Sequence, residues 1–264
     1  MLSPPLATVT LVYDHLDSTN RVARELALEG CAAGTVVLAG SQSSGRGQYG
    51  RLFSSPVGGL YFTLVLVPDL PLNALPLITL ATGLACRETI QAVTGLESLI
   101  KWPNDLYLDH RKVAGILCES VIPPGAGGAA RVLVGVGVNV NSRVNDFPGE
   151  LRPLVTTVRE HVGEPLSLQD LLPRFVHAIS DQVARIGDNR AAMLADWQRY
   201  DYLAGREVVC TVGTTVREGV AAGLSEEGRY RLCDTEGRVH EVIGGQLRLR
   251  TASRPEDSTV PGRL

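Results

Sequence analysis

Lysine is almost absent from this chain of 264 residues. Lysine and arginine together number 25, but only Lys101 and Lys112 are lysine, so 23 are arginine. A bias this strong indicates that arginine has replaced lysine wherever the exchange is harmless. An ammonium is a compact point charge on a flexible stem, whereas a guanidinium is a broad planar fork. A site that must place one positive charge between two close anions would keep lysine. Residues 101–117, which contain both lysines, are therefore the first candidate region. The alternative is that these two lysines have persisted by chance.

The chain also has no excess of positive charge. Its formal net charge is −3, so no global field attracts nucleic acid or an anionic membrane. Local arginine clusters could still hold a small phosphate. We therefore expect neither DNA nor a membrane among its partners.

Three further absences bear on the compartment. The five cysteines are odd in number and never form a Cys-x-x-Cys pair, which argues against a disulfide framework or structural zinc. The first residues contain no basic segment followed by an apolar one, so they do not resemble a signal peptide. The longest apolar stretches, such as 60–67, have the length of a strand and are too short for a membrane span. We expect a cytoplasmic protein.

What is present is enough apolar sequence for a large core. Hydrophobic residues make up 44% of the chain and charged residues 20%, typical of a globular α/β domain with a small appendage. Local patterns predict strands at 8–13, 34–41, 60–67, 105–109, 112–121 and 131–141. They predict helices from Asp17 or Ser18 to about Leu28, from about Leu75 to Val93, and at about 167–187 and 190–199. His110-Arg111 is expected to turn the 105–121 hairpin.

After Tyr202 the pattern changes to short β-rich runs separated by glycines, over residues 206–250. Five strands at this spacing predict a small closed barrel. The fold class is therefore α+β: a mixed β-sheet flanked by helices, with a small C-terminal β-barrel. The expected divisions are a catalytic domain at 1–202, the barrel at 203–250 and a disordered tail at 251–264.

A glycine–arginine loop directly follows the strand at 34–41. Its sequence Gly-Arg-Gly-Gln-Tyr-Gly-Arg occupies 45–51. Glycine lets a backbone approach a ligand closely, and arginine binds anions through two hydrogen bonds. The spacing fits neither a Walker-type phosphate loop nor a dinucleotide fingerprint. The loop therefore predicts a site for a phosphate or acyl phosphate, unless it is merely a solvated surface loop.

Two further segments combine polar groups with small residues. Asp-Ser-Thr-Asn at 17–20 lies where a strand gives way to a helix, and helix N-termini are ready polar pockets, although N-capping alone would explain it. Gly-Val-Gly-Val-Asn-Val-Asn at 135–141 has two alternate strand positions without side chains. Glycine in a strand marks a close approach by a ligand or by another part of the chain.

These segments, together with Lys-Trp-Pro-Asn-Asp at 101–105 and Lys-Val-Ala-Gly-Ile-Leu at 112–117, resemble the biotin–protein ligases (biotin–[acetyl-CoA-carboxylase] ligases). Order and spacing both fit, and the resemblance spans roughly residues 8–250. It implies that the C-terminal barrel is SH3-like. It also implies a two-step enzyme in which biotin and ATP, with Mg²⁺, form biotinyl-5′-AMP and pyrophosphate. A specific lysine of a biotin carboxyl carrier protein, or of such a domain in acetyl-CoA carboxylase or a related carboxylase, then takes the biotin and releases AMP. The family contains both monomers and homodimers.

The resemblance implies a role for each motif residue. Lys112 and Arg46 are the implied catalytic residues, with the Lys112 ammonium between the biotin carboxylate and the α-phosphate, where it would offset their repulsion. The implied biotin-binding residues are Ser18, Thr19, Asn20, Gln42, Arg46, Gly47, Gln48, Lys112 and Gly115. The implied ATP-binding residues are Arg46, Arg51, Asn104, Asp105, Lys112 and Asn139. No metal ligand is assigned, and Mg²⁺ would arrive with the ATP phosphates.

Two positions depart from the family pattern. Many relatives carry a second basic residue in place of Gln48 and a tryptophan in place of Phe53. Because Gln48 carries no charge, holding the adenylate would depend more on Arg46 and Arg51. Phe53 keeps an aromatic surface but lacks the N–H donor of an indole ring. Only 17 residues precede Ser18, so we expect no helix-turn-helix unit of the kind found in relatives that double as repressors.

Three alternatives remain open. A lipoate or octanoate ligase would share the catalytic fold, although the Gly-Arg-Gly loop and Lys-Trp-Pro-Asn-Asp favour biotin. A non-catalytic biotin sensor could have kept the pocket, although intact Lys112 and Arg46 argue against this. A nucleotide-binding interaction module would make the motifs coincidental.

Overall fold

The computed structural model describes residues 9–124 and 129–250 and contains two compact units. The first unit runs to Tyr202 and also includes Glu226–Gly228, whereas the second comprises Leu203–Ser225 and continues from Arg229. Each unit is considered on its own. The tail expected at 251–264 lies outside the described residues.

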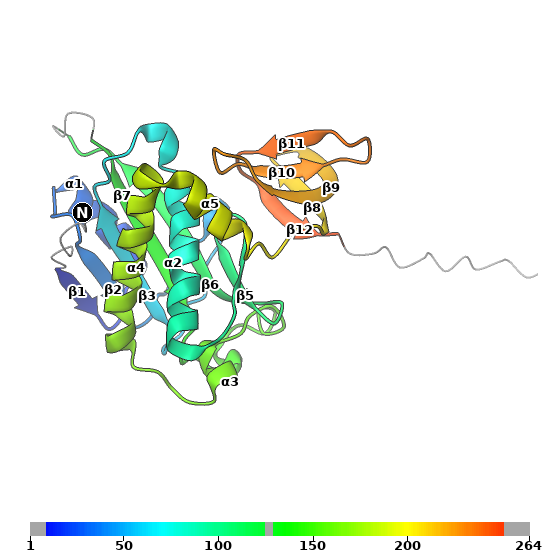
Figure 1. The fold of residues 1–264 in the computed structure, drawn as a ribbon. Coiled ribbons are helices and arrows are strands. Elements are labelled where there is room, and N and C mark those ends of the chain that lie inside the picture. Colours follow the sequence, from blue (N-terminus) through cyan, green and yellow to red (C-terminus); the bar gives the residue numbers. More distant parts are fainter. Residues whose placement is uncertain (1–8, 125–128, 251–264) are drawn as a thin grey trace, which may run out of the picture. The chain divides into compact units, whose positions relative to one another are not determined.

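The first unit is built on a mixed sheet of seven strands in the order β1-β2-β3-β7-β6-β5-β4 (Figure 1). The strands are β1 (Thr10–Tyr13), β2 (Val36–Ala39), β3 (Leu60–Leu66), β4 (Leu99–Lys101), β5 (Asp105–Leu108), β6 (Arg111–Val121) and β7 (Arg131–Val138). Strands β1 and β2 are parallel, and every other neighbouring pair is antiparallel. The long strands β3, β6 and β7 are apolar on both faces in their central parts, which predicts cover on both sides.

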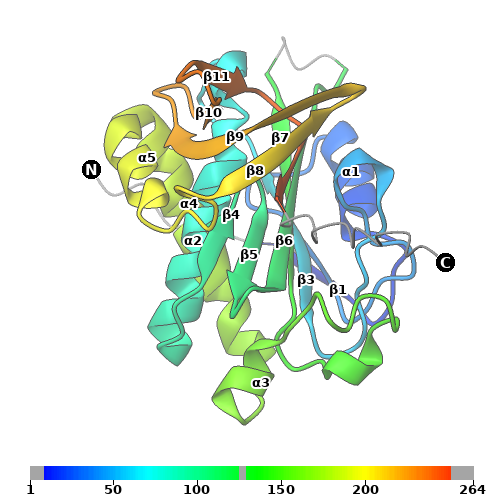
Figure 2. The ribbon, with the colours of Figure 1, turned by 90° about the vertical axis from the view of Figure 1, so that its right-hand side faces the viewer.

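Helices cover both faces of this sheet (Figure 2). The helices are α1 (Thr19–Leu28), α2 (Leu77–Thr94), α3 (Val158–Val162), α4 (Leu168–Asp188) and α5 (Arg190–Gln198), with short 3-10 turns at Gln48–Gly50, Leu72–Ala74 and Val144–Asp146. Helices α2 and α4 pack side by side on one face, whereas α1 lies on the other. On the α1 side, Ala23 and Ala27 of the helix pack against Val37, Val65 and Leu133 of the sheet. Because α1 is short, it covers only part of its face.

Most predicted elements are confirmed, with differences that have physical causes. The turn between β5 and β6 is formed by Asp109-His110 rather than His110-Arg111, since Asp109 and His110 have φ of 45° and 62°, as two-residue hairpins require. The strand expected at 131–141 ends at Val138, where Asn139 begins a connection to later residues. The sequence patterns missed β4 and α3, which span only three and five residues.

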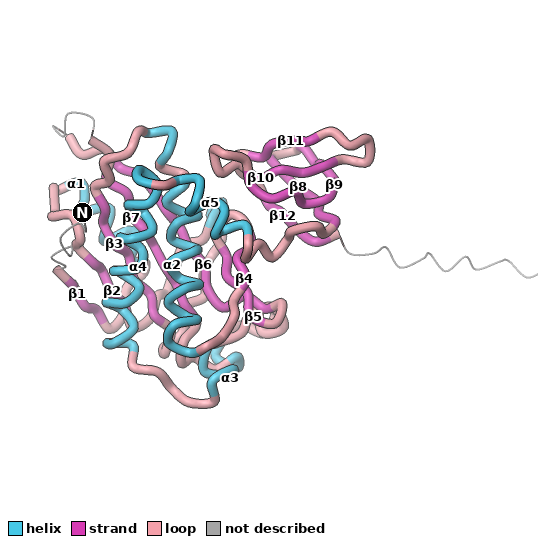
Figure 3. The backbone as a smooth tube through the Cα atoms, in the orientation of Figure 1, coloured by secondary structure: helices cyan, strands magenta, loops and turns pink. Residues whose placement is uncertain are grey.

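The second unit is an antiparallel sheet of five strands in the order β11-β10-β9-β8-β12, drawn as magenta strands in Figure 3. They are β8 (Glu207–Val212), β9 (Thr215–Leu224), β10 (Tyr230–Cys233), β11 (Val239–Val242) and β12 (Gln246–Leu249). Within residues 9–124 and 129–250, no strand pairing joins β11 to β12 and closes the sheet. The predicted class, a mixed sheet with flanking helices and a small C-terminal β unit of five strands, is confirmed.

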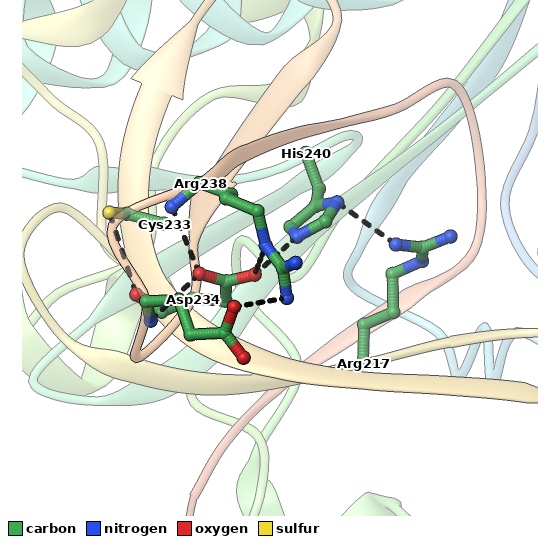
Figure 4. A network of polar contacts seen from close by, with 6 residues as sticks. Arg217, Cys233, Asp234, Arg238 and His240 are labelled. Atoms are coloured by element: carbon green, nitrogen blue, oxygen red, sulfur yellow. Dashed lines mark hydrogen bonds and ion pairs between the residues drawn. The ribbon is translucent and has the colours of Figure 1, made fainter.

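Asp234 organises the turn between β10 and β11 (Figure 4). Its Oδ1 accepts from the backbone N–H groups of Glu236 and Arg238, each at 2.9 Å. Its Oδ2 lies 2.7 Å from His240 Nε2 and 3.1 Å from Arg238 Nε. These contacts lower the pKa of Asp234 below its usual range, with the His240 hydrogen bond as the largest cause. The turn is therefore held by one ionised side chain.

None of the helices in the described ranges has the length and apolar character needed to cross a bilayer.

Candidate functional site

The centre of the site is a pair of glycines on neighbouring strands. Gly115 of β6 lies directly opposite Gly137 of β7. The aromatic ring of Phe53 rests on both, because a Cβ added at Gly115 would lie 2.8 Å from its Cε2 atom and one at Gly137 only 2.4 Å from its Cε1 atom. No larger residue fits beneath this ring. These two facing glycines therefore form a floor, which we call the glycine floor (Gly115 and Gly137), covered by one aromatic side chain.

Lys112 lies at the edge of the glycine floor and is paired with a carboxylate. Its Nζ is 2.6 Å from Asp105 Oδ1 and 5.5 Å from the centre of the Phe53 ring. Asp105 of β5 stands opposite Gly115 in the sheet, so strand pairing fixes where the carboxylate lies. Both side chains are partly exposed, at 28% for Lys112 and 21% for Asp105. The ammonium is therefore held in place while remaining reachable from outside.

The backbone of Lys112 is fixed by a distant segment. Its N–H donates to Leu154 O at 2.8 Å, and its C=O accepts from Thr156 N at 2.9 Å. The amide of Asn139 joins the same segment, since its Nδ2 donates to Thr156 O at 3.0 Å. Asn139 is buried, and no partner for its Oδ1 is found among the residues that the structure describes. A buried acceptor, Asn139 Oδ1, thus lies on a side chain bonded to the segment that holds Lys112.

Asn104 has a structural task. Its Nδ2 donates to Ile116 O at 2.7 Å, while its own C=O accepts from Ile116 N at 2.9 Å. These two bonds tie the start of β5 to β6 next to Gly115. The side chain therefore helps to shape the strand pairing beside the glycine floor.

The beginning of α1 supplies polar groups. Ser18 occupies the N-cap position, but its side chain makes no capping hydrogen bond, so N-capping does not explain this residue. Thr19 donates to Gln42 Oε1 from its backbone N–H at 2.8 Å. Gln42 Nε2 donates to Ser55 Oγ at 2.8 Å. The structure thus brings Gln42 into contact with Thr19, which lies 23 positions earlier in the sequence.

The Asn20 side chain is held by hydrogen bonds at both its nitrogen and its oxygen. Its Nδ2 donates to Glu119 Oε2 at 2.9 Å and to Leu117 O at 3.3 Å. Its Oδ1 lies 2.6 Å from Thr63 Oγ1. A Cβ at Gly135 would lie 2.1 Å from that Oδ1, so glycine at 135 makes room for Asn20. This glycine serves protein packing.

The glycine–arginine loop forms a small hairpin. Phe53 N donates to Gly45 O and Gly47 N donates to Arg51 O, both at 2.7 Å. Tyr49 and Gly50 at its tip have positive φ of 58° and 73°. The base of the hairpin places Phe53 on the glycine floor. The N–H of Gly47 is used within the hairpin, so it is not a donor for a bound anion.

The arginines of this hairpin point outward. Arg46 and Arg51 are both exposed, and the described residues offer neither of them an ion-pair partner (the ion pairs found involve other side chains). Gln48 lies in the tip at intermediate exposure. The hairpin backbone brings these residues near the glycine floor, since Phe53 lies at its base.

The second lysine belongs to an aromatic group. Lys101 of β4 pairs with Asp105 across the strands, and its Nζ lies 3.4 Å from the hydroxyl of Tyr107. Tyr107 stacks on Tyr202 with ring centres 4.7 Å apart. Burial, assisted by Asp105 and Tyr202, raises the pKa of Tyr107 above its usual range. Both lysines therefore lie close to the strand that carries Asp105.

Three parts of the site were not anticipated as functional residues. Thr63 and Glu119 sit in ordinary strand patterns, and the 154–156 segment has no motif. Their roles depend on contacts between residues far apart in the chain, which no local pattern reports. Among the described residues there is also no cluster of three or more histidine, cysteine, aspartate or glutamate side chains that could hold a metal ion.

The fold and the site define a member of the biotin/lipoate A/B protein ligase family, whose model matches residues 12–139. This range contains Lys112, the glycine floor, the hairpin and the start of α1.

Individual relatives narrow the class. The bifunctional ligase/repressor BirA of Bacillus subtilis is 32% identical over 244 residues, covering 90% of this chain and 73% of that protein. The biotin–[acetyl-CoA-carboxylase] ligase of Paracoccus denitrificans is 31% identical over 229 residues, covering 84% and 93%. The biotin protein ligase of Aquifex aeolicus, solved in complex with biotin and ATP, matches with a TM-score of 0.79 at 29% identity, covering 91% and 98%. The chain belongs to the biotin protein ligase family, which confirms the predicted family and the prediction of a ligase enzyme.

Proposed function

We propose that this protein joins biotin to ATP as biotinyl-5′-AMP and then transfers the biotin to a lysine of a biotin carboxyl carrier protein or domain. The observation that carries the proposal is the position of the Lys112 ammonium at the edge of the glycine floor, 2.6 Å from Asp105. The relatives support it further: one is named for biotin and acetyl-CoA carboxylase, and another was solved with biotin and ATP.

Lys112 would act in the first step as an electrostatic clamp. The biotin carboxylate and the α-phosphate repel each other, and they must approach to bonding distance. An ammonium between them offsets this repulsion and stabilises the charge that develops on the α-phosphoryl group. A carboxylate oxygen then forms the new O–P bond while the bond to pyrophosphate breaks. Asp105 would orient the ammonium before the substrates arrive.

Biotin would lie along the glycine floor, with its ureido ring at the start of α1. Ser18, Thr19, Asn20 and Gln42 present hydroxyl and amide groups from buried or half-buried positions, as a ring with one carbonyl and two N–H groups requires. Phe53 now fills the space above Gly115 and Gly137. Entry of biotin would displace this ring, and the displaced ring would then cover the ligand.

ATP would be held on the Lys112 side. Asn139 offers a buried acceptor and is hydrogen-bonded to the segment that fixes Lys112, and the exposed Arg46 and Arg51 could fold over the phosphates. Asn104 would support the strand geometry there. Mg²⁺ would arrive with ATP, where it reduces the negative charge of the phosphates. Asp105 is the carboxylate that could reach it, and cations of this type are commonly held by one or two carboxylates together with substrate phosphates.

In the second step the carrier lysine amine would attack the carbonyl carbon of the mixed anhydride. The C–N bond forms and the C–O bond to AMP breaks. Residues of the hairpin would shield the anhydride from water until the carrier arrives, because closing segments protect reactive intermediates.

The test is biotin-dependent exchange of labelled pyrophosphate into ATP, followed by transfer of labelled biotin to a purified carrier domain. We expect exchange with biotin but not with lipoate or octanoate, and labelling of the carrier domain but not of a variant whose target lysine is arginine. Exchange with lipoate instead would assign the chain to the lipoate branch of the family. Biotin binding without any exchange would indicate a sensor.

A further inference from the structure

A continuous chain of hydrogen bonds starts at Glu119 of β6, which forms an ion pair with Arg24 of α1, and runs to the start of α1. Glu119 Oε2 accepts from Asn20 Nδ2 at 2.9 Å, and Asn20 Oδ1 lies 2.6 Å from Thr63 Oγ1. Thr63 Oγ1 is 2.9 Å from Thr19 Oγ1, which is 3.2 Å from Gln42 Oε1. We call these five residues the polar relay. Its three central members are buried, and Thr63 is 0% exposed.

Glu119, at the outer end of the polar relay, accepts hydrogen bonds and donates none. Glu119 is the carboxylate partner of Arg24, with Oε1 2.9 Å from Nη2. Asn20 Nδ2 therefore directs one proton to Glu119 and the other to the carbonyl of Leu117. An amide has two donor protons on one atom and an acceptor on the other. These bonds orient the Asn20 amide so that Oδ1 faces Thr63.

The orientation of Asn20 then determines the direction of the hydroxyl groups. Thr63 has a single proton, and Asn20 Oδ1 can only accept, so the 2.6 Å contact uses that proton. Thr19 can give its own proton to Thr63 Oγ1 or to Gln42 Oε1, and either choice directs it into the protein. With its proton used inside the protein, the hydroxyl oxygen of Thr19 has only lone pairs to offer a ligand. Thr19 can therefore accept a hydrogen bond from a ligand but cannot donate one.

We propose that Thr63 and Glu119 are positioning residues that make Thr19 an obligatory acceptor and so select a ligand with an N–H group at that point. This inference rests on the proposed function, in which the ureido ring lies at the start of α1. The ureido ring has two N–H groups, whereas the dithiolane of lipoate and the alkyl chain of octanoate have none. A buried polar group without its partner is costly, and sites built on such groups discriminate strongly.

The glycine at position 135 leaves the space that the polar relay requires. Any side chain at this position would collide with Asn20, since a Cβ would lie 2.1 Å from Oδ1. Thr63 and Gly135 are also direct partners across β3 and β7. The sheet therefore provides both the hydroxyl that binds Asn20 and the space that Asn20 occupies.

The test compares Thr63→Val with Thr63→Ser in the full chain. Valine keeps the volume of threonine but removes the hydroxyl, so Asn20 loses its donor. Thr19 then keeps only Gln42 Oε1, which is 3.2 Å away and already accepts from the Thr19 backbone N–H, so its hydroxyl is held less firmly and can turn its proton toward the ligand. We expect the Kd for biotin, measured by calorimetry, to rise about tenfold or more. The KM for biotin in pyrophosphate exchange should rise in parallel, while kcat and the KM for ATP stay within about twofold. Serine restores the hydroxyl and should recover biotin affinity to within about threefold of wild type.

A matched control separates positioning from loss of a buried hydroxyl in general. Thr82 of α2 is also 0% exposed, and its hydroxyl donates to Ile78 O at 2.7 Å on the opposite side of the sheet. Thr82→Val should lose a comparable amount of thermal stability with unchanged biotin affinity. Equal biotin affinity in wild type and Thr63→Val would overturn the inference while leaving the proposed function intact. Wild type that binds no biotin would overturn both.

Glu119→Gln provides a second variant in case Thr63→Val does not fold. Its side chain is 23% exposed in wild type, so the exchange is easily accommodated. A glutamine can donate as well as accept, which allows the polarity of the relay to reverse. We expect a severalfold rise in the Kd for biotin and a smaller preference for biotin over lipoate. An unchanged Kd would contradict a role for Glu119.

Discussion

Lys112 and Asp105 form an ion pair of 2.6 Å across the neighbouring strands β6 and β5. The pair stands beside Gly115, which is the strand partner of Asp105. The rarity of lysine in the sequence pointed to this region, and the geometry supplies a physical reason. A Cβ at Gly115 would lie 3.1 Å from Lys112 Nζ, so the ammonium lies close against the floor, where a guanidinium would need more room.

The first prediction concerns Lys112→Arg. Arginine keeps the charge but spreads it over a wider plane, so it should not fit between the biotin carboxylate and the α-phosphate. We expect pyrophosphate exchange to fall at least about 100-fold, comparable to the loss of one preorganised electrostatic group. Biotin binding measured by calorimetry should change much less. An arginine variant with wild-type exchange would show that the lysine is not required as lysine.

The second prediction concerns Asp105→Asn. The amide has the shape of the carboxylate but cannot hold the ammonium as strongly. We expect kcat for pyrophosphate exchange to fall by about one order of magnitude, because the variant loses the attraction between opposite charges that holds the ammonium in place. The KM for biotin should remain within about twofold. A rise in the KM for biotin with unchanged kcat would place Asp105 in ligand binding instead.

The third prediction concerns the glycine floor. Gly137→Ala places a methyl group where the Phe53 ring now lies, 2.4 Å from its Cε1 atom, so both the ring and a bound biotin lose space. We expect the Kd for biotin to rise at least about tenfold, since overpacking a filled site costs about 1–3 kcal/mol. Gly149→Ala is the control, because nothing lies within 4 Å of a Cβ there. Similar biotin affinity in both variants would argue against the floor.

The glycine floor also shows how far the sequence could lead. Alternating glycines in a predicted strand indicated a close approach, and that prediction is confirmed for both Gly135 and Gly137. The sequence could not say that the approaching group at Gly137 is Phe53 whereas at Gly135 it is Asn20. Those identities depend on how a hairpin and a helix are placed over the sheet, which is set by contacts between distant residues.

Local sequence patterns were limited in the same way for the surroundings of Lys112 and for the shortest strand. Long strands and helices were readily predicted because their apolar patterns extend over several residues. Strand β4 has only three residues, too few to establish a period. The segment that fixes the backbone of Lys112, at 154–156, carries no motif and is recognised only through its hydrogen bonds.

The fourth prediction concerns thiol reactivity. Cys86 is buried and Cys118 is half-buried, and burial raises the pKa of Cys118 to about 11 and that of Cys86 still further above its usual range. The thiolate is the reactive form of cysteine, so at pH 8 only about one Cys118 in a thousand would be ionised. Cys31 and Cys233 are half-buried, as Cys118 is, so exposure alone does not separate them from Cys118. We expect alkylating reagents to modify Cys31 and Cys233 well before Cys86 and Cys118, because burial disfavours the thiolate at the latter two. Mass spectrometry of native protein after brief labelling would measure the order, and early modification of Cys86 would contradict it.

The last prediction concerns Asp234 and acid. Because its folded pKa is lowered, chiefly by His240 and also by Arg238, the ionised carboxylate stabilises the turn at pH values above its unfolded pKa of about 3.9. This contribution is lost as the pH falls from there through the folded pKa. Asp234→Asn keeps an acceptor for the turn but has no such charge. Wild type should therefore protect the amides of β10 and β11 from hydrogen exchange better than the variant at pH 6, with the difference shrinking steadily below about pH 4.

The choice of probe matters for this comparison. Both tryptophans, Trp102 and Trp197, precede Leu203, where the second unit begins, so their fluorescence would not report directly on this turn. Exchange measured on peptides covering 230–242, with wild type and variant at the same pH, reports on it. A difference between the two proteins that stays constant from pH 6 to pH 3 would mean that the turn depends on the shape of Asp234 and not on its charge. The contacts to His240 and Arg238 would then be consequences of the turn rather than its cause.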